Sequence, residues 1–318
     1  KITVGISQSV SGRAFEFALL QVLHNKLDNG QKIKIKKDGQ YDQIKAAYGE
    51  VGRVKSTVEY DNAAKEAVIF LTDREPKLRE GKNLLDEIIL SRQSDNAGKT
   101  GDVRDILIQR KSQGWEIGIS GKWNNESVKS PRLTAKSCFG EAWLGLPCSG
   151  EYLPRMREIF KDNKGDKRKW KDVPEEEKMN KYYRPVAEEF VRELKFLMER
   201  DKTIASKFAE YVIGKQDFYK IIGKKNQVVV EGYNFRNTLQ VKPTKLPDDI
   251  MKISYLPDTG RKPAGLTIVI ACNKGWQFHG RIHNKDTRVS DSESLAIEIT
   301  LEGKSKYLFT HDIQVRIR

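Results

Sequence analysis

The sequence predicts an α/β protein with a mixed sheet core flanked by helices, a helical insertion and a β-rich C-terminal part. Helical and extended apolar patterns alternate up to about residue 150, residues 184–214 are strongly helical, and short β runs follow from about 226. An order of mixed α/β, then α, then β is typical of an α/β core that carries an insertion. We therefore expect three segments, namely 1–150, 151–225 and 226–318.

The N-terminal elements follow from the spacing of apolar residues. The first helix is predicted from "SGRAFEFALLQVLHNKL", with Ser11 as N-cap and Glu16 beside the apolar stripe. An edge strand with solvent-facing lysines is predicted from "QKIKIKK" (31–37). A short helix follows from "YDQIKAAYGEV", and then another helix and a buried strand at 67–71. The stretch "LREGKNLLDEIILSRQ" fits either a helix or an extended buried element.

A hairpin is predicted from "GDVRDILIQRKSQGWEIGISGKW" (101–123), where two apolar runs flank a short turn near Gln113. The polar, Gly-rich stretch 94–102 is expected to be the loop that leads into it. A hairpin on the surface does not need carboxylates and an amine gathered at one end. The presence of both at one end suggests a site.

Pairing about that turn sets Asp105 opposite Gly121, so that its carboxylate meets the side chains of Ser120 and Lys122. Glu116 shares a strand face with Lys122 but lies about 20 Å from it, too far for both to touch one metal ion. The same spacing would also occur if Asp105 were a turn residue and Lys122 a lysine on an edge strand, with no functional site.

An acid beside a lysine suits phosphodiester hydrolysis. A carboxylate binds Mg²⁺ through oxygen, and the metal lowers the pKa of water and neutralises charge on the scissile phosphate. The lysine can orient or deprotonate the attacking water. A hard cation needs a second acid, for which Glu16 is preferred, within about 8 Å of Asp105. Glu116 stays open, although a salt bridge with Arg110, a dimer contact or strand anchoring suits it better.

Composition narrows the class of protein. A formal net charge of +14 attracts polyanions, of which nucleic acid is the commonest in cells. No apolar run reaches the length of a membrane span, and the first residues lack the features of a signal peptide. Three cysteines, none in a CxxC pair, indicate neither a disulfide framework nor a cysteine zinc site, so a cytoplasmic protein is expected.

The residues Asp105, Ser120 and Lys122 form a D-x₁₄-S-x-K pattern that resembles the PD-(D/E)xK nuclease signature, with serine where the second acid usually stands. The wider text resembles the HaeIII-like type II restriction endonucleases. The matching strings keep that family's order over most of the chain: "SGRAFEFALL" (11–20), "GDVRDILI" (101–108), "WEIGISGKWNN" (115–125), "VKSPRL" (128–133), "YVIGKQDFYKII" (211–222) and "GWQFHGRIHN" (275–284).

The resemblance implies a restriction-endonuclease-like fold and Mg²⁺-dependent cleavage of double-stranded DNA by a homodimer, at a short GC-rich palindrome, GGCC. It implies no small-molecule cofactor beyond the metal. Asp105 and Glu16 would bind the metal, Lys122 would activate water, and Ser120 would hold a water or orient the lysine. Glu116 remains a candidate because it belongs to the recognisable "WEIGIS" string.

Contacts with DNA are expected from two stretches. The first follows the hairpin and the second lies in "HGRIH" and the next residue; the candidates are Asn124, Asn125, Lys129, Arg132, Arg281, His283 and Asn284. On a strand, the two histidines of "HGRIH" lie about 13 Å apart, too far to share a zinc ion, and the helix that an HNH nuclease requires is missing. For the stretch after the hairpin, the structural alternative is a helix N-terminus. For "HGRIH", it is a hydrogen-bonded histidine on a strand.

The basic stretch "KDNKGDKRKWKD" (161–172) is expected to be a solvated loop, although its composition would also suit contact with a nucleic-acid backbone. Two rival functions remain. One is a DNA-binding protein without cleavage on a degenerate nuclease fold, and the other is a ribonuclease. The intact pair of Asp105 and Lys122 argues against the first, because a dead nuclease has no chemical need of both.

Overall fold

A computed structural model describes residues 6–28, 30–80, 86–94, 102–256, 265–302 and 305–315. The chain divides into two compact units that are discontinuous in sequence. The first combines residues 1–126, 215–245 and 307–318, and the second combines 127–214 and 246–306. Most of the loop expected at 94–102 lies outside the described residues.

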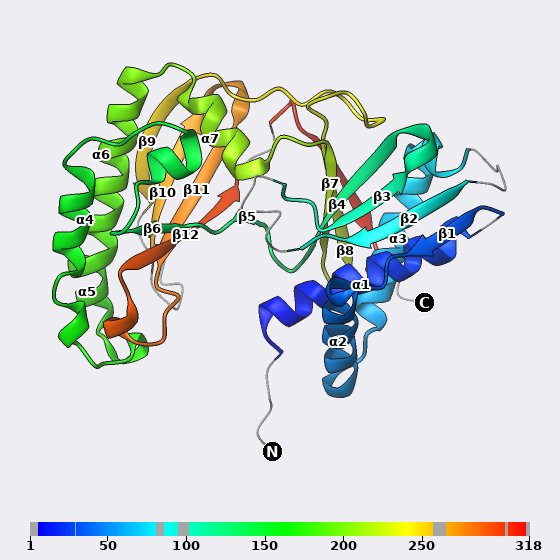
Figure 1. The fold of residues 1–318 in the computed structure, drawn as a ribbon, viewed down its shortest axis with the longest axis horizontal. Helices are drawn as coiled ribbons and strands as arrows, with labels where there is room; N and C mark the ends of the chain where they lie inside the picture. Colours follow the sequence, from blue (N-terminus) through cyan, green and yellow to red (C-terminus); the bar gives the residue numbers. More distant parts are fainter. Residues whose placement is uncertain are drawn as a thin grey trace. The chain divides into compact units, whose positions relative to one another are not determined.

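A seven-stranded mixed sheet forms the centre of the first unit (Figure 1). The pairs β1 with β2 and β4 with β7 are parallel and the other pairs are antiparallel, so the predicted mixed sheet is confirmed. Its strands, in spatial order, are β1 (Lys32–Ile35), β2 (Glu87–Arg92), β3 (Ile106–Arg110), β4 (Trp115–Trp123), β7 (Phe218–Gly223), β8 (Gln227–Tyr233) and β13 (Phe309–Gln314).

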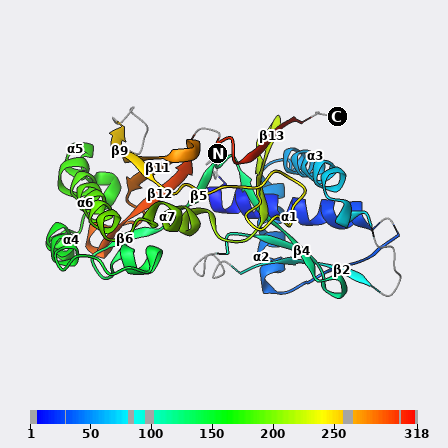
Figure 2. The same ribbon diagram turned by 90° about the horizontal axis from the view of Figure 1, so that it is seen from above.

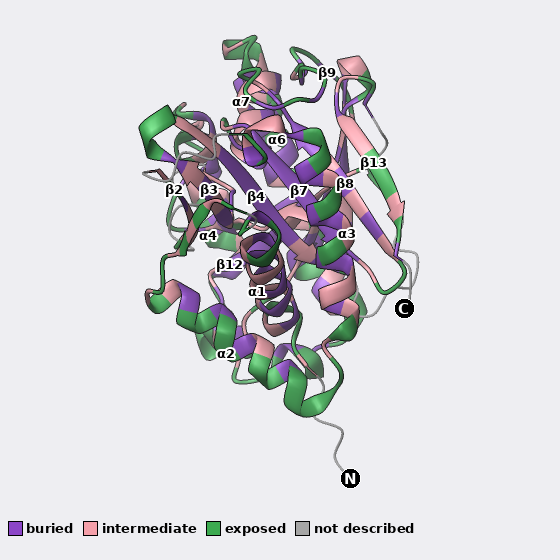
Figure 3. Cartoon of the chain, turned by 90° about the vertical axis from the view of Figure 1, so that its right-hand side faces the viewer, coloured by how far each residue is buried: buried purple, intermediate pink, exposed green. Residues whose placement is uncertain are grey.

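Three helices pack with this sheet: α1 (Gln8–Leu27), α2 (Gly39–Val54) and α3 (Val58–Arg74). Phe15 of α1 and Tyr60 of α3 both contact Trp123 of β4, with ring centroids 5.3 and 4.0 Å away. Figure 3 shows β4 and β7 as mostly buried strands, with α1 in front of β4. Burial of these apolar surfaces fixes α1 against the strand that carries Ser120 and Lys122.

Several predicted elements need correction. Helix α1 begins at Gln8 with Ser7 as N-cap, and Ser11 is buried inside it. Residues 67–71 belong to α3, because Ala64, Ala67, Val68 and Leu71 recur at helical spacing and form its buried face. The edge strand is confirmed as β1, with exposed lysines, and the extended alternative is correct for β2.

A six-stranded antiparallel sheet forms the centre of the second unit. Its order is β5 (Ser127–Lys129), β12 (Ser294–Leu301), β11 (Gln277–His283), β10 (Leu266–Cys272) and β9 (Ile250–Leu256), with β6 (Arg132–Thr134) also paired to β12. Figures 1 and 2 show α4 and α6 side by side next to this sheet. The helices are α4 (Tyr152–Phe160), α5 (Glu175–Glu177), α6 (Arg184–Arg200) and α7 (Ile204–Ile213).

The boundaries of the two units do not coincide with the three expected segments. Within the expected segment 151–225, residues Phe218–Gly223 form strand β7 beside β4. Strands β8 and β13 of the β-rich part also join the first sheet. Within 161–172, Trp170 is buried and packs on Tyr182, so this stretch is anchored rather than fully solvated.

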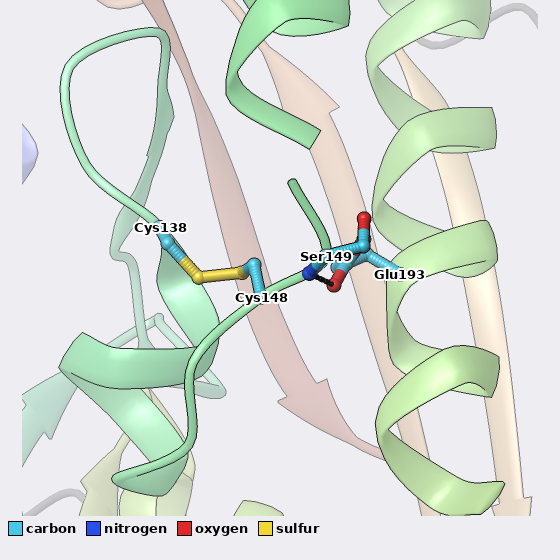
Figure 4. The surroundings of a disulfide bond; sticks show 4 residues. All are labelled: Cys138, Cys148, Ser149 and Glu193. Atoms are coloured by element: carbon cyan, nitrogen blue, oxygen red, sulfur yellow. Dashed lines mark hydrogen bonds between the residues drawn. A yellow bond between two sulfur atoms is a disulfide. The ribbon is translucent and has the colours of Figure 1, made fainter. Parts of the chain in front are cut away.

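A disulfide joins Cys138 and Cys148, contrary to the expectation that no disulfide forms (Figure 4). The π-helical turn Gly140–Leu144 folds the chain back, which brings the two Cα atoms to 6.1 Å. The next residue, Ser149, donates from its N–H and hydroxyl to Glu193 of α6, at 2.6 and 2.7 Å. Sequence spacing gave no sign of this pair.

A membrane span is not found among the helices that the structure describes, because none is sufficiently long and apolar. Apolar side chains instead gather in the interior of each unit.

Candidate active site

Asp105 lies directly before β3 and contacts the side chains predicted for it. One carboxylate oxygen, Oδ2, accepts from the Ser120 hydroxyl at 2.9 Å, from the Gly121 N–H at 3.0 Å and from the Lys122 ammonium at 3.3 Å. The convergence of Asp105, Ser120 and Lys122 is therefore present in the structure. The carboxylate is held by three donors from one segment of β4.

The register of the hairpin differs by one residue from the expected one. Asp105 donates its N–H to the carbonyl of Ile119, and strand pairing then places it one residue before the expected partner, Gly121. The turn is a 3₁₀ segment at Lys111–Gln113 closed by Gly114, whose φ of +66° suits glycine. The predicted contacts form despite this difference of one residue in register, because the side chains extend to neighbouring positions.

Glu16 reaches the same site from helix α1. It is buried, and Arg92 of β2 donates to it at 3.2 Å and to Gln40 at 2.6 Å. Burial, followed by the charge of Asp105, raises the pKa of Glu16 to about 7, although Arg92 opposes the shift. The two carboxylates therefore repel each other, as expected where two negative charges are held in one site.

Gly121 permits the close approach of α1 to β4. A Cβ atom at this position would lie 3.0 Å from the Leu19 side chain and 3.5 Å from Cγ of Glu16. Any larger residue would press against the turn of α1 that carries Glu16. The glycine of the "SGK" string thus helps to bring Glu16 toward Asp105.

Lys122 carries a proton in this environment. Burial opposes its charged form, but the carboxylates of Asp105 and Glu16 outweigh that effect and raise the pKa of the ammonium above its usual value. A protonated lysine donates hydrogen bonds and offsets negative charge. In this state it does not accept a proton from water.

Glu116 lies elsewhere. It accepts from Arg104 at 2.5 Å and from Gln109 at 3.0 Å, at the end of β4 away from Lys122. The expected alternative of a salt bridge with Arg110 is wrong, because the guanidinium of Arg110 contacts Asp86 instead, at 3.4 Å. Glu116 therefore anchors the strand, and the second carboxylate near Asp105 comes from Glu16.

A cavity of about 260 Å³ opens over these residues. Its walls include Glu16, Arg92, Asp105 and Lys122, together with Gly12 and Arg13 of α1. Sequence reasoning missed Arg92 and Arg13. The available signals were weak: Arg92 is a charged residue that ends an apolar strand, and Arg13 precedes Glu16 by one helical turn.

The donor set is small. No cluster of three or more His, Cys, Asp or Glu side chains able to hold a metal ion occurs in the part of the chain that the structure describes. Two carboxylates, from Glu16 and Asp105, line the cavity.

The DNA-contact candidates after the hairpin fall in different environments. Asn125 lines the cavity, whereas Asn124 is exposed, with a left-handed φ of +49°, and donates its N–H to Gly223. In the second unit, the Lys129 ammonium lies 3.7 Å from the ring centroid of Tyr211 and donates to its carbonyl. Arg132 holds Asp286 through two hydrogen bonds of 3.0 and 2.9 Å.

The candidates in "HGRIH" and the next residue lie on or directly after β11. Arg281 and His283 alternate with buried residues along the strand. His283 shares a hydrogen bond of 2.9 Å with the carbonyl of Asn284, and burial lowers the pKa of its imidazole. The side-chain oxygen of Asn284 accepts from the Tyr183 hydroxyl at 2.7 Å. Both His283 and Asn284 therefore also have structural contacts.

Comparisons with known proteins show the family to which the chain belongs. The family model for the HaeIII restriction endonuclease matches residues 12–304. The type II restriction enzyme HaeIII of Haemophilus aegyptius is 33% identical over 311 residues, which cover 92% of this chain and 93% of that protein. A solved structure with significant similarity was not found.

The mixed α/β fold and these matches define a type II restriction endonuclease, a site-specific deoxyribonuclease. The resemblance seen in the sequence is confirmed. The chain belongs to the HaeIII restriction endonuclease family.

Proposed function

We propose that the protein cleaves both strands of GGCC in double-stranded DNA, with Mg²⁺ as cofactor, and leaves 5′-phosphate and 3′-hydroxyl ends. The observation that carries this proposal is the convergence of Asp105, Ser120 and Lys122 with Glu16 over one cavity. The family supports a DNA substrate, and the GC-rich palindrome follows from the resemblance. A two-fold palindrome suits a two-fold protein, so we propose a homodimer. We also propose that it acts in the cytoplasm, on the basis of its DNA substrate and not of its cysteine content, since a disulfide joins Cys138 and Cys148.

Mg²⁺ fits the residues at the cavity. This ion keeps several waters and usually takes one or two protein carboxylates, which matches a donor set of Asp105 and Glu16. A cation held by these carboxylates would also offset the repulsion that contributes to the raised pKa of Glu16. When bound, Mg²⁺ would supply charge neutralisation at the phosphate and a lower pKa for water.

The protein's own groups have distinct parts in the reaction. The Lys122 ammonium offsets the negative charge that develops on the phosphate and orients the attacking water through an N–H donor. Ser120 and the Gly121 N–H fix the Asp105 carboxylate, and Arg92 fixes Glu16. We propose that Asn125 contacts DNA at the cavity, while Asn124, Lys129, Arg132, Arg281, His283 and Asn284 remain proposed contacts.

One assay tests the activity. The protein is incubated with duplex DNA that contains GGCC, with the same duplex carrying one changed base pair, and with duplex RNA, each with and without Mg²⁺. Cleavage of the GGCC duplex alone, and only with Mg²⁺, is expected. Binding of that DNA without cleavage would indicate the non-cleaving alternative, and cleavage of RNA would indicate a ribonuclease.

Melting experiments test the metal independently of activity. Mg²⁺ should raise the melting temperature of the wild type, because a ligand of the folded state stabilises it. Asp105→Asn should lose most of this rise. An equal rise in both proteins would mean that Mg²⁺ binds elsewhere.

A further inference from the structure

We propose that Gly12 and Arg13 of helix α1 form a contact surface for the sugar-phosphate backbone of the DNA strand at the cavity. Gly12 leaves the space that the backbone needs, and Arg13 supplies positive charge. This inference rests on the proposed nuclease function. Gly12 and Arg13 have no part in the proposed reaction, and the inference gives them a role in binding the substrate.

Packing within the described part of the chain does not require glycine at position 12. It lies inside a 20-residue helix and is not among the glycines with positive φ. A Cβ atom placed there would meet no atom of the described residues within 4 Å. Glycine in a helix interior is destabilising relative to alanine, so a packed helix gains nothing from it. Close approach of another molecule is a reason that remains, and Gly12 lines the cavity with Asp105 and Lys122.

The position on the helix directs the strand toward the reacting groups. Gly12 and Glu16 are four residues apart, so they share a face of α1 one turn from each other. A backbone that passes over Gly12 therefore continues toward the carboxylates. A protruding side chain at Gly12 would stand in that path.

The charge of the cavity suits a phosphodiester. Its lining holds three basic side chains, Arg13, Arg92 and Lys122, and two carboxylates, those of Glu16 and Asp105, so basic groups outnumber acidic ones. The planar guanidinium of Arg13 matches the geometry of phosphate oxygens.

Gly12→Ala, compared with Gly49→Ala, tests the space. Gly49 lies in α2 and is exposed, and an added Cβ there would likewise have no neighbour within 4 Å among the residues that the structure describes. Both variants should melt no lower than the wild type. In a Lys122→Ala background, affinity for a GGCC duplex should fall about tenfold with Gly12→Ala, further with Gly12→Leu, and not with Gly49→Ala. Unchanged affinity in both Gly12 variants would overturn the proposal.

Arg13→Gln tests the charge. Each phosphate contact contributes about 0.9 to the slope of log affinity against log salt, so the slope should become shallower by about one. An unchanged slope would exclude the phosphate contact. These outcomes separate the two proposals: if Gly12→Ala cuts and binds like the wild type while the wild type cuts GGCC, only the contact surface fails, whereas a wild type that never cuts DNA refutes the function.

Discussion

Three donors hold one oxygen of Asp105, so the carboxylate remains fixed by Ser120 and Gly121 if the lysine is removed. Lys122→Ala should therefore reduce cleavage by several orders of magnitude and leave binding of specific DNA within about tenfold, since the ammonium acts on the phosphate and water. Single-turnover cleavage and equilibrium binding measure the two effects. Lys178→Ala, at another largely buried lysine in the second unit, is the control. Cleavage by Lys122→Ala near the wild-type rate would mean that the site is assigned wrongly.

Lys129 provides a pH-dependent prediction. Burial lowers the pKa of its ammonium to about 8, below the ordinary value of 10.5. Because the folded-state pKa is the lower one, the stabilising contribution of this group is complete above about pH 10.5 and is lost as the pH falls through about 8. Lys129→Met carries no charge at any pH. Its melting temperature relative to the wild type should therefore be higher at pH 7 than at pH 10.

The same comparison with Lys171→Met, at an exposed position, controls for the loss of a lysine. If the difference between Lys129→Met and the wild type does not vary with pH, burial does not control protonation at this position. If it varies in the opposite direction, the contact of the ammonium with the Tyr211 ring outweighs burial.

Sequence reasoning reached the parts of the site that lie on adjacent strands. Asp105, Ser120 and Lys122 could be brought together because a hairpin turn sets the pairing, and an error of one residue did not separate them. Glu16 could be preferred because its helix has an apolar stripe that must pack on the sheet. Arg92 could not be found, since its role depends on how α1 packs against β2.

At the level of elements, periodicity identified most helices and strands but failed where two patterns overlap. Residues 67–71 form an apolar run that fits a short strand and a helix equally well. These residues are helical in the structure, because the whole stretch Val58–Arg74 has a buried face at helical spacing. Strand β7 was missed as part of the first sheet because no local signal states which strand it joins.

The disulfide makes a prediction at the same scale. It closes a short loop, because its cysteines are 10 residues apart. Closing such a loop lowers the entropy of the unfolded chain and so stabilises the folded state by about 2–3 kcal/mol. The double variant Cys138→Ser, Cys148→Ser should melt lower than the oxidised wild type. Reductant should lower the melting temperature of the wild type to that of the variant and leave the variant unchanged. A wild type that does not respond to reductant would show that the bond does not stabilise the fold.

For the whole molecule, the formal net charge of +14 predicts strong electrostatic attraction to DNA. Affinity for duplex without GGCC should fall steeply with salt, because phosphates neutralised by the protein release their counterions. Titrations of such a duplex at several salt concentrations measure the slope. A slope near zero would mean that the basic residues do not meet DNA.

The order in which the sheet is assembled also has a consequence for protein synthesis. Strand β4 pairs with β7, and one hundred residues separate the paired Gly118 and Phe218. A growing chain therefore presents the strand of Ser120 and Lys122 to its surroundings, with one edge unpaired, until β7 has left the ribosome. Unpaired edges of apolar strands favour aggregation. The same delay means that an incomplete chain lacks β7 beside the strand of Ser120 and Lys122, so we expect the ability to cut DNA to arise late in translation.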